Sequence, residues 1–215
     1  MNFNVNGLFN PENRFLSFMD KIMNLCVAGI LWFLFSLPLI TVGAATSALF
    51  GYTLKLARNE EGYLLKSFWK GFWENFVTST LLWLGTLAVG MFLAADLFAC
   101  QFLPAVGALR WGVRALLVSL IFVYFLTIIY LFPLVATFRV SWKKVVRDAL
   151  VMGVGNLYVS VTVLVIYGFF GVITWFFPIL FMVWFALAAY FSSHLLYSVF
   201  MRYLPEKDEL YNSER

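Results

Sequence analysis

The sequence is short of charge. Only 12% of its 215 residues are Asp, Glu, Lys or Arg, whereas a soluble domain carries about 25%. So few charged side chains do not cover a water-facing surface, and 63% of the residues are hydrophobic, with a mean hydropathy of +0.88. A soluble globular protein is therefore excluded. Disorder is excluded as well, because it requires few aromatic residues and 20% of this chain is aromatic. We expect one integral membrane domain over residues 1–215.

Cysteine and histidine are scarce too. The two cysteines, Cys26 and Cys100, lie far apart in the sequence, and His194 is the only histidine. Neither a disulfide framework nor a zinc site is indicated by this spacing, and we expect both cysteines to serve as small apolar residues. The sequence predicts no metal site and no cofactor.

Basic residues exceed acidic ones, which gives a formal net charge of +4 and a pI near 9.1. A nucleic-acid-binding protein needs its basic residues on one face of a soluble scaffold. In a membrane protein, the excess of Lys and Arg in cytoplasmic loops explains the same charge. We expect no nucleic-acid partner.

Four long runs of the chain carry no charge: residues 22–54, 75–95, 115–138 and 149–201. A transmembrane helix needs about 20 apolar residues, so the second and third runs each predict one span. The last run is long enough for two spans. It contains Pro178, which ends one helix and fits the first turn of the next, so a tight hairpin is expected there.

The first run is ambiguous. One straight helix over its 33 residues would measure about 50 Å, against a hydrocarbon core of about 30 Å. The candidate helix break comprises Ser36, Pro38, Thr41 and Gly43. Pro38 lacks a backbone donor, and Thr41 fits the N-cap of a second helix over 42–57. The chain either turns back at this break or only kinks.

The distribution of Lys and Arg favours a turn. If the chain turns back, there are six spans, and one side of the membrane carries 13 of the 15 basic residues; if it only kinks, there are five spans and that side carries 11. Because cytoplasmic loops are enriched in Lys and Arg, we favour six spans in an all-α polytopic bundle, with five as the alternative. The six predicted spans are about 22–38, 42–57, 76–96, 114–137, 151–173 and 178–200. Both arrangements place the C-terminus in the cytoplasm, and the six-span arrangement places the N-terminus there too.

The segment over residues 64–76 predicts an amphipathic helix. One stripe at helical spacing is apolar, and it comprises Leu65, Phe68, Trp69, Phe72, Trp73 and Phe76. Lys66, Lys70 and Glu74 fall four residues apart on the other side. We expect a helix in the headgroup plane of the cytoplasmic face, with its rings toward the hydrocarbon and its ammonium groups toward anionic lipid. The same Lys, Trp and Phe surface also suits a docking site for a partner.

The second cytoplasmic segment repeats this pattern more weakly. Trp142, Val145, Val146 and Ala149 share one face, and Lys143, Lys144 and Arg147 share the other. Each segment runs into the next span through a similar phrase, residues 75–79 and 156–160, which both begin with Asn and end with Ser. Internal duplication, as in many transporters, and chance are both open readings.

Several stretches of the chain resemble a known family. They comprise Asn24-Leu25, Leu31 to Ala44, Ala48-Leu49, Glu61-Gly62 and Phe68 to Phe76. This pattern is similar to the YesL family of small multi-pass bacterial membrane proteins of uncharacterised function. The resemblance implies a bacterial plasma membrane and a role near carbohydrate import, because members are commonly encoded beside sugar importers. Permease subunits of an ABC importer are the partners that it implies. The family has no established site residues to carry over.

Ionisable side chains at membrane depth mark ion pathways when they are present. Asp96 is expected at the outer interface, and His194 toward the cytoplasmic end of the last span. We expect Asp96 to be solvated and His194 to be hydrogen-bonded between helices. No Ser-His-Asp set and no phosphate-binding loop is present, so the sequence predicts no enzyme.

Three classes of function remain. The first is a non-catalytic accessory component of oligosaccharide uptake. The second is a permease or channel for an uncharged solute. The third is a lipid-interacting protein.

Overall fold

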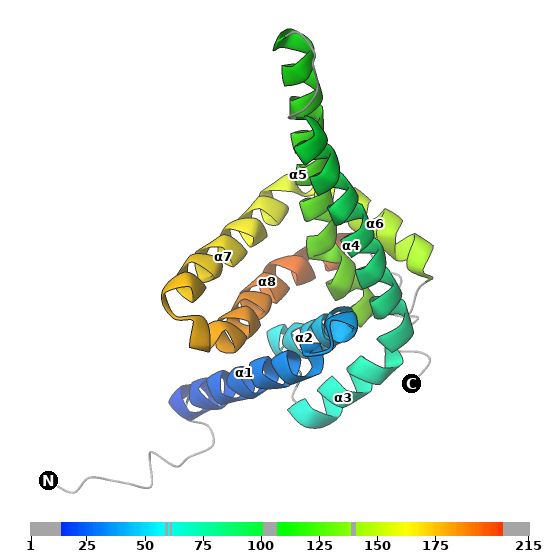
Figure 1. The fold of residues 1–215 in the computed structure, drawn as a ribbon. Coiled ribbons are helices and arrows are strands. Elements are labelled where there is room, and N and C mark those ends of the chain that lie inside the picture. Colours follow the sequence, from blue (N-terminus) through cyan, green and yellow to red (C-terminus); the bar gives the residue numbers. More distant parts are fainter. Residues whose placement is uncertain (1–13, 59, 61, 101–106, 139–140, 204–215) are drawn as a thin grey trace, which may run out of the picture.

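The computed structural model describes residues 14–58, 60, 62–100, 107–138 and 141–203. These residues form helices and no strand (Figure 1). The order is α1 (Arg14–Ser36), η2 (Leu39–Thr41), α2 (Val42–Ala57), α3 (Leu64–Glu74), α4 (Phe76–Ala99), α5 (Gly107–Thr137), α6 (Trp142–Gly155), α7 (Leu157–Phe176), η4 (Pro178–Leu180) and α8 (Phe181–Tyr203).

Within these residues, six helices are long and apolar enough to cross a membrane. They are Met19–Ser36, Leu39–Ala57, Phe76–Ala99, Trp111–Thr137, Leu157–Phe176 and Pro178–Tyr203. The prediction of an all-α polytopic bundle with six spans is therefore confirmed. The predicted cytoplasmic positions of the two termini concern residues outside the described ranges.

The chain turns back between α1 and α2. The indole Nε1 of Trp32 donates a hydrogen bond to Thr46 Oγ1 at 3.1 Å. In a merely kinked helix, residues 14 positions apart would lie about 20 Å from one another. Thr41 stands at the expected cap position, but its side chain makes no cap bond. Its hydroxyl instead donates to the carbonyls of Phe35 and Pro38. Phe35 lies in the last turn of α1, where carbonyls lack partners within the helix.

Helix α2 lies at the centre of the bundle. Of its apolar window, 61% is buried, against 6–33% for the other spans, and it contacts α1, α3, α4, α5 and α8. Small residues allow this close packing. A Cβ on Gly43 would collide with the Ser79 carbonyl oxygen and would lie 2.6 Å from Trp83 Cβ.

Hydroxyl groups join the spans across their interfaces. Thr53 of α2 and Ser193 of α8 are hydrogen-bonded at 2.8 Å, and both side chains are buried. The phenol of Tyr124 in α5 donates to the Thr86 carbonyl of α4 at 2.8 Å. Where apolar burial does not distinguish protein from lipid, such bonds help to fix which helices pair.

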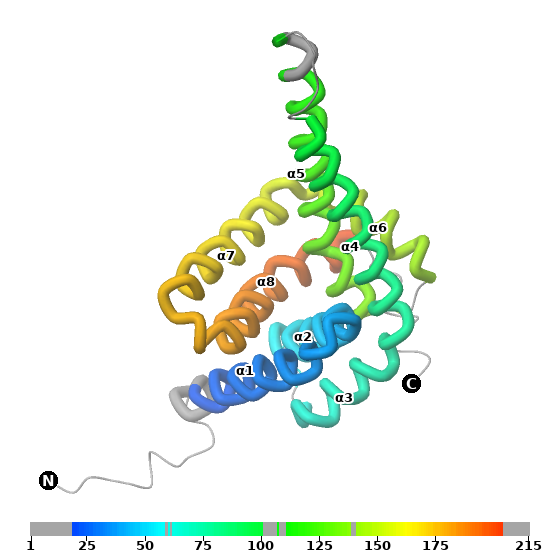
Figure 2. Tube along the Cα trace, viewed as in Figure 1, coloured from blue at the N-terminus to red at the C-terminus, as the bar shows by residue number. Residues whose placement is uncertain are grey.

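Helices α4 and α5 form a long hairpin that projects beyond the other helices (Figures 1 and 2). Helix α5 begins at Gly107, seven residues before the predicted span 114–137, and continues through Pro133. Pro133 is buried, and its carbonyl accepts a hydrogen bond from the Thr137 hydroxyl at 2.8 Å. The apolar pattern located the membrane-compatible part of this helix and missed its first two turns.

The start of α7 also differs from the sequence prediction. Residues 151–155 of the predicted span 151–173 continue α6. Met152 and Gly153 are buried, and a Cβ on Gly153 would lie 2.9 Å from the Leu126 carbonyl oxygen of α5. Packing on α5 therefore prolongs α6. The predicted hairpin break is present, since α7 ends at Phe176 and Pro178 opens the next helical turn.

Candidate functional site

The first amphipathic helix, α3, folds back on α2. Its Leu64, Phe68 and Phe72 side chains are buried in the main hydrophobic core. Gly71 lies close to α2, since a Cβ there would be 3.6 Å from Ala48 Cα. The helix is thus anchored to the core through one of its faces.

The predicted apolar stripe is divided between two environments. Phe68 and Phe72 are 1% and 4% exposed, whereas Trp69 and Trp73 are 54% and 56% exposed. The expectation that all of these rings face the hydrocarbon is therefore corrected. The stripe is wide enough for one side of it to pack on α1 and α2 while the other side remains at the surface.

Phe35 of α1 joins α3 to the first hairpin. Its ring centroid lies 4.9 Å from Phe72, 5.6 Å from Trp69 and 5.8 Å from Phe68. Trp69 and Trp73 are in edge contact at 6.0 Å. The sequence pattern does not mark Phe35 as a site residue. Its position in an apolar run carries no signal that separates it from its neighbours.

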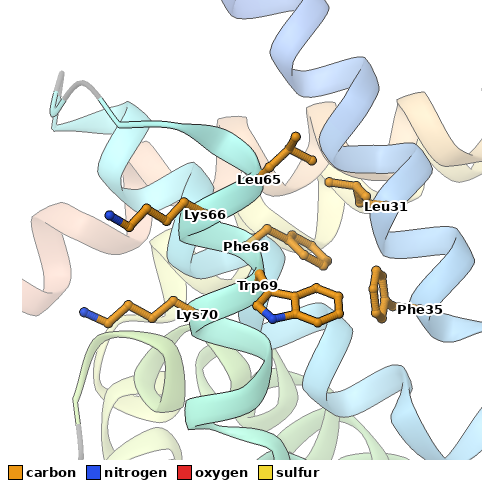
Figure 3. Close-up of a pocket in the computed structure, with 7 residues that line it drawn as sticks. All are labelled: Leu31, Phe35, Leu65, Lys66, Phe68, Trp69 and Lys70. Carbon is orange, nitrogen blue, oxygen red and sulfur yellow. The ribbon is translucent and has the colours of Figure 1, made fainter.

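A shallow groove of about 620 Å³ lies between α1 and α3. Figure 3 shows Leu31 and Phe35 of α1 facing Phe68 and Trp69 of α3. Lys66 and Lys70 extend from the opposite side of α3 (Figure 3), and Lys70 lies 4.0 Å from the Glu74 carboxylate. We call the exposed side chains of Leu65, Trp69 and Trp73, together with this groove, the aromatic groove. It offers apolar contact beside two cations.

The second amphipathic helix, α6, folds back on α5 in the same manner. Val145 and Ala149 are buried, whereas Trp142, Val146 and Leu150 are exposed. The exposed side chains line a second groove of about 760 Å³ between α4, α5 and α6. This groove was not foreseen, because three separate elements form it.

The two ionisable candidates lie apart. Asp96 is half-buried in the last turn of α4, and its backbone carbonyl accepts the amide of Cys100. His194 is exposed on α8, and its ring lies edge-on to Tyr190 at 4.8 Å. The neighbouring Ser193, rather than His194, makes the hydrogen bond between helices. Neither residue belongs to the aromatic groove.

The break residues surround the turn that positions α1 against α3. Ser36 ends α1, Pro38 precedes η2, and Gly43 stands in the first turn of α2. Among the described residues, no group of three or more His, Cys, Asp or Glu side chains is arranged to hold a metal ion.

Comparison with known proteins finds a family match that covers this site. A family model described as "Protein of unknown function, DUF624" matches residues 25–97, which include Phe35 and all of α3. "Uncharacterized protein YteU" of Bacillus subtilis (strain 168) is 29% identical over 163 residues, which cover 70% of this chain and 68% of that protein. No solved structure matches. The chain is thus similar to a family of unknown function and to a protein described as uncharacterized.

Proposed function

We propose that this chain is a YesL-type, non-catalytic accessory component of a bacterial plasma membrane. In this proposal it binds permease subunits of an ABC importer for oligosaccharides. The resemblance over residues 24–76 supports the family, and the genomic setting of that family supports the link to carbohydrate import. The concentration of Lys and Arg in and around α3 and α6 supports a cytoplasmic position for both helices.

The observation that carries the proposal is the pair of exposed tryptophans on a rigid helix. Trp69 and Trp73 are more than half exposed, while Phe68 and Phe72 on the same helix are fixed in the core. Tryptophan is enriched among the residues that dominate binding energy in protein interfaces. A rigid helix presents these rings without a large loss of conformational entropy on binding.

The test is co-purification of the importer's permease subunits from native membranes in mild detergent, after crosslinking in the membrane. The test variant carries Trp69→Ala and Trp73→Ala. The control is Trp175→Ala, because Trp175 is 86% exposed in the last turn of α7, away from α3. Truncating one hot-spot tryptophan costs about 2 kcal/mol or more, roughly 30-fold in affinity.

We expect wild type and W175A to retain the permease subunits, and the double variant to lose them. Thermal unfolding in detergent checks that the double variant is folded. Purification of the wild-type chain alone, or unchanged binding by the folded double variant, would refute the proposal. Flux of an uncharged solute into liposomes that contain only this chain would show instead that the chain is itself a permease or channel.

A further inference from the structure

The groove between α4, α5 and α6 is a large apolar recess. Its volume of about 760 Å³ lies within the range of about 300–1,000 Å³ that is typical of ligand pockets. Leucine, valine and isoleucine side chains line most of it. We infer that this groove binds one acyl chain of an anionic phospholipid, whose phosphate lies beside the first turn of α6.

The groove lies where α4 and α5 leave space beside one of their contacts. The Tyr124 hydroxyl donates to the Thr86 carbonyl, and a Cβ on Gly90 would lie 2.6 Å from that hydroxyl. At Gly85, by contrast, a Cβ would meet no atom within 4 Å. Tyr124 therefore ties the two helices together, while Gly85 leaves room along their flank.

The length of the groove fits one leaflet. Its wall on α4 extends from Leu81 to Leu93, which is about 18 Å at the rise of an α-helix. A hydrocarbon core of about 30 Å has leaflets about half as thick. A partner helix that crosses the whole membrane would need a groove about twice as long, so the length of this groove favours a single acyl chain.

Charge distinguishes the two ends of the groove. Trp142 lines the end that borders the first turn of α6, and the Lys143 ammonium lies 5.4 Å from its ring centroid. Lys144 and Arg147 are exposed on the same helix. Clusters of basic residues beside a membrane segment attract anionic headgroups. The recess thus offers an apolar wall for a hydrocarbon chain and cations where a lipid phosphate would lie.

Two variants and two controls test the two halves of the site. Gly85→Leu fills the space for the chain, and Gly168→Leu on α7 is its control, because a Cβ on Gly168 also meets nothing within 4 Å. Leucine has a higher helix propensity than glycine, so neither change opposes folding. Lys143→Gln with Arg147→Gln removes headgroup charge, and Lys66→Gln with Lys70→Gln is the matched control on α3.

The measurement is native mass spectrometry of the full chain after delipidation and titration with phosphatidylglycerol or phosphatidylcholine. We expect one retained phosphatidylglycerol per wild-type chain and weaker retention of phosphatidylcholine. G85L should reduce retention about tenfold or more and G168L should not. K143Q/R147Q should remove the preference for phosphatidylglycerol, while K66Q/K70Q should keep it. In wild type, phosphatidylglycerol with a photoactivatable acyl chain should label α4 or α5.

Equal retention of phosphatidylglycerol by G85L and wild type would overturn the proposed binding of an acyl chain in the groove. Equal retention of the two lipids by wild type would overturn the headgroup assignment. A wild-type homodimer that is absent in G85L would show that a second copy occupies the groove. Failure of the permease test above leaves these outcomes unaffected, because the aromatic groove and this groove share no residue.

Discussion

Two segments of the chain, α2–α3–α4 and α5–α6–α7, follow the same local plan. In each, a span is followed by an amphipathic helix that folds back on it. A glycine of that helix lies close to the span, Gly71 against Ala48 and Gly153 against Leu126. In both segments the amphipathic helix therefore turns a glycine toward the preceding span, at ordinary contact distance for Gly71 and at a closer backbone approach for Gly153.

The correspondence continues into the next span. Asn75 and Asn156 end the amphipathic helices, and the serines four residues later, Ser79 and Ser160, are both buried. Ser79 donates to Ser47 of α2 at 3.0 Å, and Ser160 donates to Tyr130 of α5 at 3.2 Å. Each serine thus bonds to the span that precedes its own amphipathic helix. This shared geometry supports internal duplication over chance.

The two segments differ in what they expose. α3 buries phenylalanine and exposes tryptophan beside α1, whereas α6 buries aliphatic side chains and a glycine and exposes side chains that line the groove against α4 and α5. Small residues and hydroxyls set the common plan, while the large side chains decide the surface. Two segments with the same local plan therefore offer two different surfaces.

The largest expected effect is at the buried face of α3. Phe68→Ala should lower the free energy of unfolding by about 3–5 kcal/mol, because it leaves a cavity in a packed core. Val145→Ala at the matching face of α6 should cost clearly less, since fewer buried groups are removed. Thermal unfolding in detergent measures both. Similar losses of stability at the two positions would contradict the difference between the aromatic buried face of α3 and the aliphatic buried face of α6.

The next effect concerns close backbone approach. Gly43→Ala should cost about 1–3 kcal/mol, since its Cβ forces α2 away from Ser79 and Trp83. Gly153→Ala should cost a similar amount through Leu126. Gly51→Ala is the control, because its Cβ would lie 3.8 Å from the nearest side chain, Ala136. Unchanged unfolding temperatures for G43A and G153A would contradict the packing described here.

The smallest effect tests the duplicated serines. Ser79→Ala and Ser160→Ala should each lower stability by about 0.5–1.5 kcal/mol, through loss of one hydrogen bond between helices. Ser119→Ala should change nothing measurable, because Ser119 is exposed and bonds only within its own helix. If only one of the two variants loses stability, the two segments share a backbone arrangement but not the stabilising serine hydrogen bond.

Much of the fold was predictable from sequence. Uncharged runs located the spans, Pro38 and Pro178 marked both tight hairpins, and helical spacing found α3 and α6. Helix ends were less accurate, because Met152 and Gly153 continue α6 for a reason that lies on α5. The exposed tryptophans of the aromatic groove were singled out, but the division of their stripe was not, since periodicity alone does not show how wide a buried face is.

By itself the sequence determined that most of this chain is apolar enough for a membrane and where its long apolar helices lie, because hydropathy and chain-breaking residues act locally. The tertiary structure alone decided that α2 is the central helix, that Phe35 meets α3, and that a groove opens beside Gly85. These features depend on contacts between residues far apart in the chain. Nearly every position in such spans is apolar, so composition does not distinguish a side chain that meets protein from one that meets lipid.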